Sequence, residues 1–549
     1  MLRGRLKPFD ASGIFRPVGA TGEFRRRAVR SAGVTVLSQG VVFGTQMIAT
    51  IVLARLLAPA DFGVVTMVTT FSLLIMGFGQ NGYSEAVIQR EDIDQSLASN
   101  LFWINVSAGL VLTLIFAASG SLLARFYGDP RVARIAVGMS LTILLNSTSV
   151  LHLSLLKRAL HFSVTSANDI VATIVSVSSM ILLASGGWGY WALVAGAVIR
   201  LLVQSAGAWY LCHWIPSLPR RVSGTSSVVR FASNVYGRFS FNYLTRNTDN
   251  LLVGWRFGST SLGFYKKAYD LFLLPANQLA VPVSDVVLST LSRLERGSAQ
   301  YKRYFLNGLS ILAFVGMGAG AALTLMGKDV IRLLLGPKWG AAGQIFTFFG
   351  PGIGVMLIYT TSGAIHLSIG RADRWFRWVV LEFSVTVLLF LLGLHWGPTG
   401  IAAAWTASFW LLTIPAFWYA GKPINFGVGP VVASVWKYVL ASALAGCATA
   451  ASVHAVPSLA VLSGAVGAAV RILITASLFS VLYIAAVIVL HGGLDPVHRL
   501  LSLVPDMLPW KKEANAPVPP DSAAVDATNV SEDGLAVPEN SRLCSEEAR

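Results

Sequence analysis

Long apolar segments recur along most of the chain, and short polar stretches separate them. Many of these segments reach the roughly 20 residues that an α-helix needs to cross about 30 Å of hydrocarbon. The pattern predicts an all-α, polytopic membrane protein with about fourteen spans, which we place at 31–56, 62–88, 99–123, 132–156, 166–186, 189–212, 234–256, 262–291, 305–326, 340–369, 376–395, 398–420, 432–453 and 465–491.

The order of these spans suggests how the chain is divided. We expect two six-helix bundles around a central cavity, followed by two additional transmembrane helices. The connections are short and leave no room for an extramembrane catalytic domain. The expected parts are a basic cytoplasmic N-terminal segment (1–30), the first bundle (31–212), a cytoplasmic linker (213–233), the second bundle (234–420), the two extra helices (432–491) and a disordered cytoplasmic tail (505–549).

Composition agrees with a membrane protein and excludes several alternatives. Charged residues make up 12% of the chain, whereas a soluble domain has about 25%. The net charge of +16 is spread in short clusters between apolar segments. This distribution favours anchoring at an anionic cytoplasmic membrane surface over binding of nucleic acid. The three cysteines, Cys212, Cys447 and Cys544, are too far apart in sequence to indicate a disulfide framework or a metal site.

The chain contains an internal repeat at a nearly constant offset. Two pairs of short motifs are separated by 200 residues, and two further pairs are separated by 208 residues. The even number of spans per repeat predicts two halves with the same orientation, related by an axis along the membrane normal, as in alternating-access transporters. The pairs are Arg30-Ser-Ala with Arg230-Phe-Ala, Ala60–Gly63 with Thr260–Gly263, Tyr127–Pro130 with Leu335–Pro337, and Trp188-Gly189 with Trp396-Gly397.

The seventh predicted span carries the richest set of polar residues inside the membrane. Arg238, Asn242, Arg246 and Asp249 follow at steps of four, four and three, so they lie on one side of a helix. Such residues are costly in lipid and indicate a polar interior. A simpler alternative is that Arg246 and Asp249 pair with each other to stabilise the helix.

Other candidate substrate-binding residues lie outside that span. Gln39 and Gln46 on the first span can bind sugar hydroxyls or join helices to each other. Arg55 near its end and Arg200 on the sixth span are further candidates, although Arg200 can also extend to the membrane surface. A basic cavity lined with amides suits an anionic phosphate head that carries sugars.

Asp249 and Glu382 are candidates for ion coupling, with H⁺ or Na⁺ as the ion. Pairing of each acid with a nearby arginine is the structural alternative. The sequence shows no motif for nucleotide binding, metal binding or covalent catalysis. We therefore expect that the protein is not an enzyme and has no cofactor or metal site.

Five ordered motifs resemble the polysaccharide and lipopolysaccharide flippases of the multidrug/oligosaccharidyl-lipid/polysaccharide exporter superfamily, which include O-antigen and exopolysaccharide exporters. The likeness runs from about residue 28 to 420. The motifs are Leu53–Gly63, Glu85–Arg90, Leu155–Phe162, Trp188–Gly196 and Leu262–Leu271.

The positive-inside rule, applied to the basic N-terminal tail, places both termini in the cytoplasm. The resemblance implies translocation of an undecaprenyl-diphosphate-linked oligosaccharide across the inner membrane. It implies membrane lipids and other polysaccharide-assembly membrane proteins as partners, and no nucleic acid. Related flippases use arginines on the first helices and an acidic pair on helices 7 and 11, where Arg55, Asp249 and Glu382 fall by position. The alternative is a small-molecule or multidrug exporter of the same superfamily.

Overall fold

The computed structural model describes residues 8–10, 12–15, 21–89, 93–220, 225–275, 287–457, 464–495 and 498. Within these residues the regular structure is helical, and extended pairing is limited to two isolated β-bridges, 9–15 and 14–94.

The helices named below belong to one compact unit, Met1–Pro496. They are α1 (Thr21–Leu56), α2 (Pro59–Gly77), η1 (Phe78–Tyr83), α3 (Ser84–Gln89), α4 (Gln95–Tyr127), α5 (Arg131–Arg158), α6 (Phe162–Ser185), α7 (Tyr190–Cys212), α8 (Thr225–Pro275), α10 (Ala299–Leu335), η3 (Pro337–Trp339), α11 (Gly340–Thr360), α12 (Ser362–Ser368), α13 (Ala372–Gly393), η4 (Leu394–Trp396), α14 (Gly397–Gly421), η5 (Lys422–Ile424), α15 (Val428–His454) and α17 (Gly464–His491).

The all-α prediction is confirmed. Eleven stretches of the described residues are long and apolar enough to cross a membrane, and one of them, Asp373–Ile424, contains both α13 and α14. Helix α8 joins two limbs at Gly258, whose φ of 77° and ψ of −179° interrupt the helical geometry. The protein is therefore a multi-pass membrane protein, while the number of fourteen spans stays a prediction.

Two helices begin earlier than the sequence pattern indicated. Helix α8 starts at Thr225, inside the predicted linker 213–233. Its first turns are helical because Val228 and Ala232 are buried in a cluster with residues of α3, α4 and α5. Helix α1 starts at Thr21, inside the predicted N-terminal segment 1–30. The predicted tail 505–549 lies outside the described residues.

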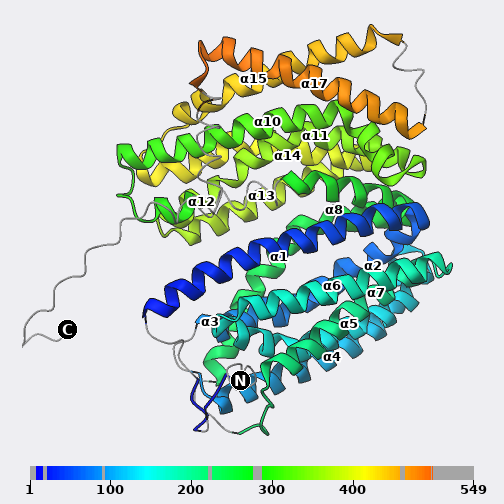
Figure 1. Cartoon of the computed structure of the whole chain (residues 1–549), viewed down its shortest axis with the longest axis vertical. Helices are drawn as coiled ribbons and strands as arrows, with labels where there is room; N and C mark the ends of the chain where they lie inside the picture. The colour runs from blue at the N-terminus through cyan, green and yellow to red at the C-terminus, as the bar shows by residue number, and fades with distance from the viewer. Residues whose placement is uncertain are drawn as a thin grey trace, which may run out of the picture. The chain divides into compact units, whose positions relative to one another are not determined.

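The helices form two groups that we call the N-terminal lobe (α1–α7) and the C-terminal lobe (α8–α14). In the first, α4 packs on α5, α6 on α7 and α1 on α6. In the second, α11 packs on both α10 and α14, and α13 packs on α14. Helix α8 contacts α2 of the first lobe as well as α11 and α14, while α15 and α17 pack on α10 at the outside (Figure 1).

The repeat found in the sequence appears as equivalent turns in the two lobes. Gly128 follows α4 and Gly336 follows α10, both with positive φ (68° and 99°). Gly189 precedes α7 and Gly397 begins α14, and their φ values are also positive (54° and 74°). Glycine is suited to these turns because other residues rarely adopt positive φ. The paired motifs therefore mark corresponding helix ends.

The two lobes meet where α2 crosses the second limb of α8. A Cβ atom added at Gly63 would lie 1.7 Å from the carbonyl oxygen of Ser259. A Cβ atom added at Gly263 would lie 1.9 Å from the carbonyl oxygen of Pro59. Gly63 and Gly263 are 200 positions apart in the sequence, and so are the residues they contact, Pro59 and Ser259. The crossing is therefore reciprocal, and it brings the two backbones into direct contact.

Beside this crossing, one turn of each lobe contacts the other lobe. Arg131, after α4, donates from its guanidinium to Ser259 Oγ at 3.0 Å. Trp339, after α10, donates from its indole nitrogen to the carbonyl oxygen of Ala54 at 2.8 Å. The rings of Phe62 and Trp339 meet edge to face, with centroids 5.5 Å apart. Together with the glycine crossing, these contacts join the lobes at this end of the bundle.

Candidate functional site

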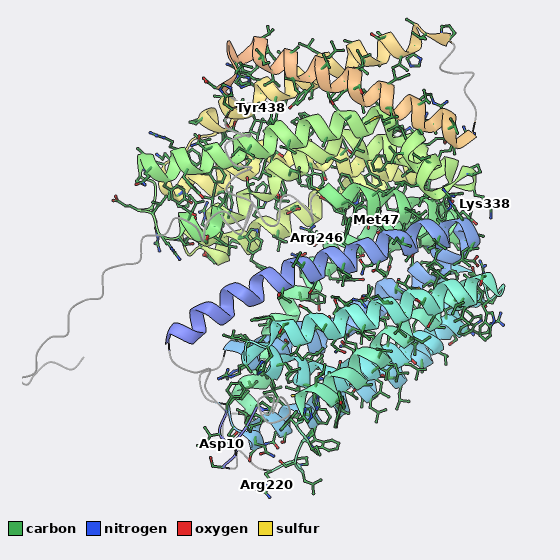
Figure 2. The ribbon with its side chains drawn as sticks, in the orientation of Figure 1. Asp10, Met47, Arg220, Arg246, Lys338 and Tyr438 are labelled. Carbon is green, nitrogen blue, oxygen red and sulfur yellow. The ribbon has the colours of Figure 1, made fainter. Side chains whose placement is uncertain are left out.

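The first limb of α8 carries two of the predicted polar residues on one face. Asn242 and Arg246 are one helical turn apart, and Arg246 Nε donates to Asn242 Oδ1 at 3.2 Å. This contact follows from their spacing, because side chains four residues apart are neighbours on a helix. Figure 2 shows where Arg246 lies in the molecule. The pair places an exposed guanidinium and an amide side by side on α8.

Asn242 and Arg246 line a cavity of about 110 Å³ in the C-terminal lobe. Its walls come from α8, α11, α12, α13 and α14, which places it within one lobe. The lining combines ionisable groups, an amide, several hydroxyls and aromatic rings. Its residues are Asn242, Thr245, Arg246, Met356, Tyr359, Thr360, Ser362, Gly363, Trp375, Trp378, Val379, Glu382, Thr386, Trp405 and Phe409.

Glu382 on α13 brings an acidic group into the same cavity. It shares the cavity with Tyr359 of α11 and Arg246 of α8. The acidic and basic groups of the cavity therefore come from two different helices, α13 and α8. The arginine that lines the cavity with Glu382 lies 136 positions earlier in the chain, whereas the structural alternative assigned the acid a nearby arginine.

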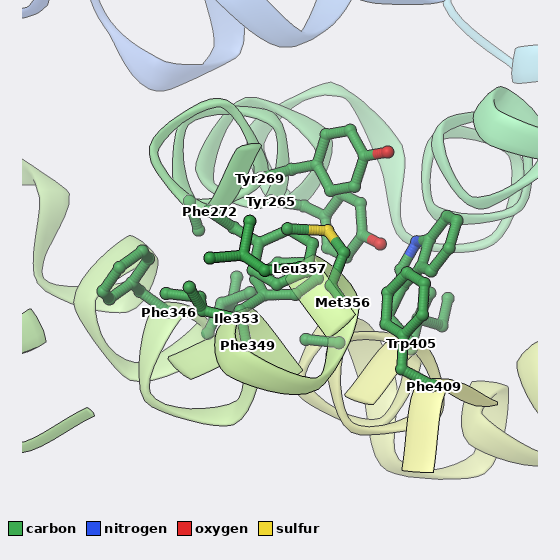
Figure 3. Close-up of a cluster of buried hydrophobic side chains, with 14 of the residues drawn as sticks. Tyr265, Tyr269, Phe272, Phe346, Phe349, Ile353, Met356, Leu357, Trp405 and Phe409 are labelled. Atoms are coloured by element: carbon green, nitrogen blue, oxygen red, sulfur yellow. The ribbon is translucent and has the colours of Figure 1, made fainter. Parts of the chain in front are cut away.

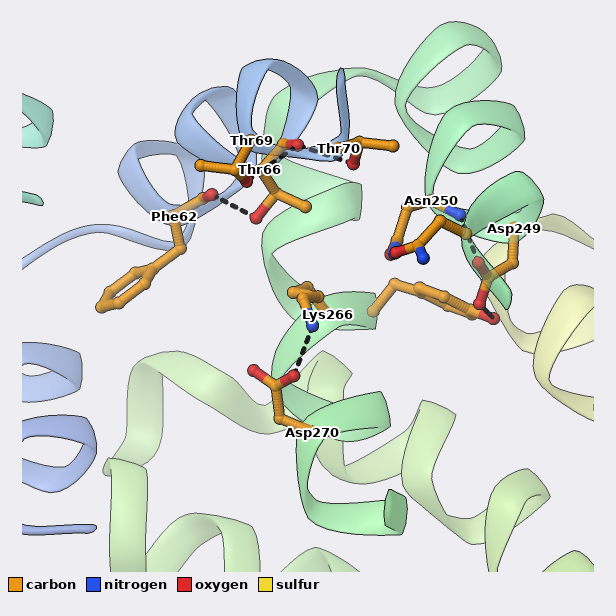
Figure 4. A network of polar contacts seen from close by, with 10 residues as sticks. Phe62, Thr66, Thr69, Thr70, Asp249, Asn250, Lys266 and Asp270 are labelled. Carbon is orange, nitrogen blue, oxygen red and sulfur yellow. Dashed lines mark hydrogen bonds and ion pairs between the residues drawn. The ribbon is translucent and has the colours of Figure 1, made fainter. Parts of the chain in front are cut away.

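Asp249 has a different environment. Its side chain is completely buried, and Asp249 Oδ2 accepts hydrogen bonds from the Tyr265 hydroxyl and the Trp405 indole, both at 2.8 Å. The Asn250 backbone nitrogen donates to the other oxygen at 2.7 Å. The carboxylate thus joins the two limbs of α8 to α14. Figure 4 shows Asp249 next to Asn250. These three contacts account for Asp249, so it is not the partner that the simpler alternative assigned to Arg246.

An aromatic cluster supports the inner end of the cavity. Phe272 of α8 stacks on Phe349 of α11 with ring centroids 4.8 Å apart. Trp405 and Phe409 of α14 stack at 5.5 Å, and both also line the cavity. Figure 3 shows these rings packed together. The cavity wall is therefore part of the hydrophobic core of the lobe, which holds the polar groups in place.

The remaining predicted binding residues lie elsewhere. Arg55 donates to the carbonyl oxygen of Leu333 at 3.1 Å, beside the junction of α1 and α10. Arg200 forms an ion pair with Asp169 at 3.1 Å, within the N-terminal lobe. Gln39 and Gln46 are exposed on α1. The side chain of Arg238 lies outside the described residues. The structure thus brings together Asn242, Arg246 and Glu382, and it separates this group from Arg55 and Arg200.

Sequence reasoning missed the aromatic walls of the cavity. Trp375 and Trp378 precede Glu382 on α13 at steps of three and four, so the three residues share one helix face. Tyr359 comes from α11, and Trp378 Nε1 donates to its hydroxyl at 2.8 Å. The helical spacing on α13 was a usable signal, whereas the contribution of α11 depends on how the helices pack.

The described residues contain no group of three or more histidine, cysteine, aspartate or glutamate side chains that could hold a metal ion. The cavity offers hydrogen-bond donors and acceptors in place of metal ligands.

Comparison with known proteins agrees with this architecture. Among curated relatives, the chain is 25% identical over 367 residues to the teichuronic acid biosynthesis protein TuaB of Bacillus subtilis, covering 66% of this chain and 72% of TuaB. It is 21% identical to the succinoglycan biosynthesis transport protein ExoT of Rhizobium meliloti, covering 66% and 73%. It is 20% identical to the lipopolysaccharide biosynthesis protein WzxC of Escherichia coli, covering 73% and 82%.

Solved structures show the same fold. The lipid II flippase MurJ in an inward closed conformation matches with a TM-score of 0.66 at 14% identity, covering 83% of this chain and 98% of MurJ. An inward-facing multidrug resistance MATE family transporter matches with a TM-score of 0.57 at 11% identity, covering 71% and 98%. The family model described as "Polysaccharide biosynthesis protein" matches residues 52–343, which is more than half of the chain. The chain belongs to this family of polysaccharide biosynthesis proteins.

Proposed function

We propose that the protein is a flippase that moves an undecaprenyl-diphosphate-linked oligosaccharide repeat unit across the inner membrane, for exopolysaccharide or O-antigen synthesis. The observation that carries this proposal is the cavity shared by Asn242, Arg246 and Glu382 inside a membrane-spanning lobe. Family membership and the names of the relatives support the same class of cargo.

The chemistry of the cargo explains why such a cavity is needed. Each polar group moved into hydrocarbon without a hydrogen-bond partner costs about 2–7 kcal/mol, so a head group of several sugars cannot cross unaided at a useful rate. A guanidinium suits phosphate oxygens because its donors form a fork that matches them. The amide and hydroxyl groups of the lining replace water around sugar hydroxyls.

The proposal includes the surroundings of the protein. The lipid-linked oligosaccharide and membrane lipids are its binding partners, and other polysaccharide-assembly membrane proteins are expected to act beside it. The basic N-terminal segment favours a cytoplasmic N-terminus by the positive-inside rule. An even number of spans then places the C-terminus on the same side.

Deleting the gene tests the function. We expect the lipid-linked repeat unit to accumulate on the cytoplasmic face of the membrane, with loss of surface polymer, because the head group cannot cross without the carrier. Lipid extraction and gel analysis of surface polysaccharide measure both effects. Complementation with the intact gene is the control. Normal polymer on the surface of the deletion strain would contradict the proposal.

A multidrug exporter of the same superfamily is the second candidate, since a multidrug resistance transporter shares the fold. The polar character of the cavity favours the flippase, because Arg246 and Glu382 suit a charged, hydroxylated head group better than an apolar drug. Growth of an overexpressing strain in a panel of cationic drugs separates the two: the flippase assignment predicts unchanged drug tolerance.

We further propose that an ion gradient drives the cycle through Asp249 or Glu382. Glu382 is the better placed of the two, because it lines the cavity, whereas the oxygens of Asp249 already receive three hydrogen bonds. The neutral variants Asp249→Asn and Glu382→Gln are tested for transport in vesicles under an imposed H⁺ or Na⁺ gradient. Glu382→Gln is expected to lose the response to the gradient. Full gradient-driven transport by both variants would remove the coupling proposal.

A further inference from the structure

The cavity of the C-terminal lobe combines two features that the proposed function does not yet use: its small size and its aromatic walls. Pockets that enclose a whole drug-sized ligand measure about 300–1,000 Å³. The cavity here measures about 110 Å³. It is therefore too small for an oligosaccharide, and its size fits one ring or substituent that enters from a larger head group.

The polar groups of the lining define what kind of group can enter. Glu382 accepts hydrogen bonds, Arg246 only donates, and Asn242 does both. The hydroxyls of Thr245 and Thr360 donate to main-chain carbonyls of their own helices, so they offer acceptor oxygens to a ligand. Ser362 and Thr386 add two further hydroxyls to the lining. A neutral polyol matches this mixture, because each of its hydroxyls also donates and accepts. An apolar group would form none of these hydrogen bonds.

Charge disfavours a second kind of occupant. Glu382 lines the cavity and repels a phosphate that enters it. Phosphate recognition by Arg246 thus requires the phosphate to approach from outside the cavity, on the side of the guanidinium away from Glu382.

The walls contain tryptophan rings that are held in fixed positions. Trp378 is fixed by its hydrogen bond to the Tyr359 hydroxyl, and Trp405 by its hydrogen bond to Asp249. Trp375 stands against α12, where a Cβ atom added at Gly363 would lie 3.4 Å from its indole nitrogen. A pyranose ring has an apolar C–H face as well as polar edges, so it can pack on an aromatic wall while its hydroxyls reach the polar groups.

We propose that this cavity is a sugar subsite that takes one ring of the lipid-linked head group, with Glu382, Asn242 and Arg246 binding its hydroxyls and the tryptophans packing on its apolar face. The inference rests on the proposed flippase function and adds a specificity site to it. A site built to hydrogen-bond a hydroxyl strongly rejects an analogue that lacks it. The subsite would therefore select which repeat unit is carried.

Protection of a single cysteine from alkylation tests the subsite with the native ligand. Gly363→Cys places a thiol at the cavity wall in a chain whose Cys212, Cys447 and Cys544 are replaced. Membranes come from two strains: one lacks the polymerase and accumulates the lipid-linked repeat unit, and the other lacks the enzyme that attaches the first sugar phosphate to the lipid. We expect maleimide labelling to be about fivefold slower in the first strain, since bound ligand shields the thiol in proportion to occupancy.

Matched controls identify the source of any protection. Gly429→Cys, exposed at the start of α15 with open space around it, is expected to label equally in both strains. Removing a wall with Trp375→Ala is expected to abolish the protection at position 363, whereas Trp436→Ala, an exposed tryptophan of α15, preserves it.

Two outcomes would overturn the subsite. One is equal labelling at position 363 in both strains. The other is full protection at position 363 that persists in Trp375→Ala, which would show that the aromatic wall does not contribute to ligand binding. If the deletion strain accumulates lipid-linked repeat units, either result removes the subsite and leaves the proposed flippase function in place. Normal export in the deletion strain removes both proposals.

Discussion

Gly63→Ala and Gly263→Ala are each expected to lower polymer export about tenfold or more, because an added methyl group at a closely packed site costs roughly 1–3 kcal/mol. The methyl would lie 1.7 Å from Ser259 O in the first variant and 1.9 Å from Pro59 O in the second. These neighbours are backbone atoms and cannot rotate away, so the two lobes must separate at the crossing. Surface polymer in a complemented deletion strain, at matched protein level, measures the loss.

A third glycine provides the matched control. Gly44 on α1 has no atom within 4 Å of an added Cβ, and alanine in a helix is about 0.5–1 kcal/mol more favourable than glycine. Gly44→Ala is therefore expected to export normally. Size-exclusion profiles in mild detergent show whether the variants at the crossing still fold. Wild-type export by both Gly63→Ala and Gly263→Ala would show that close contact at the crossing is not required for transport.

Arg246→Ala is expected to lower export about tenfold or more, since a hydrogen bond to a charged group contributes about 1.5–3 kcal/mol. Arg246 lines the cavity and holds Asn242 through its Nε, so the variant loses both a charge and an ordered amide. Arg246→Lys is expected to recover part of the activity, because lysine keeps the charge and loses the forked donors. Export is again measured as surface polymer at matched protein level.

Arg293→Ala is the control for charge. Arg293 is exposed in the segment before α10, away from the cavity, and its replacement is expected to leave export unchanged. Equal export by Arg246→Ala and Arg293→Ala would refute the assignment of Arg246 to the site.

The two sets of residues act at different places in a carrier. The glycine crossing and the turns at Arg131 and Trp339 join the lobes, so their variants affect how the lobes move against each other. The cavity lies inside the C-terminal lobe, so its variants affect what is carried. Variants at the crossing should reduce export of any cargo, whereas variants of the cavity walls should depend on the sugar.

Part of the candidate site was predictable because it lies on one helix. The step of four between Asn242 and Arg246 places them together on any α-helix, and the structure shows their contact. The same argument grouped Asp249 with them, yet Asp249 points into the core and bonds Tyr265 and Trp405. Periodicity gives the direction of a side chain around its own helix. The neighbouring helices determine whether a side chain in that direction points into the cavity or into the core.

The length of the apolar segments and the repeated turn motifs are local properties, so they were enough to predict a helical membrane protein built from two related halves. Which distant residues meet depends on helix packing: Glu382 and Arg246 line one cavity, Gly63 lies against Ser259, and Arg200 pairs with Asp169 within its own lobe. These contacts depend on the packing angles of separate helices, which arise from the combined fit of many side chains and are not encoded in any one segment.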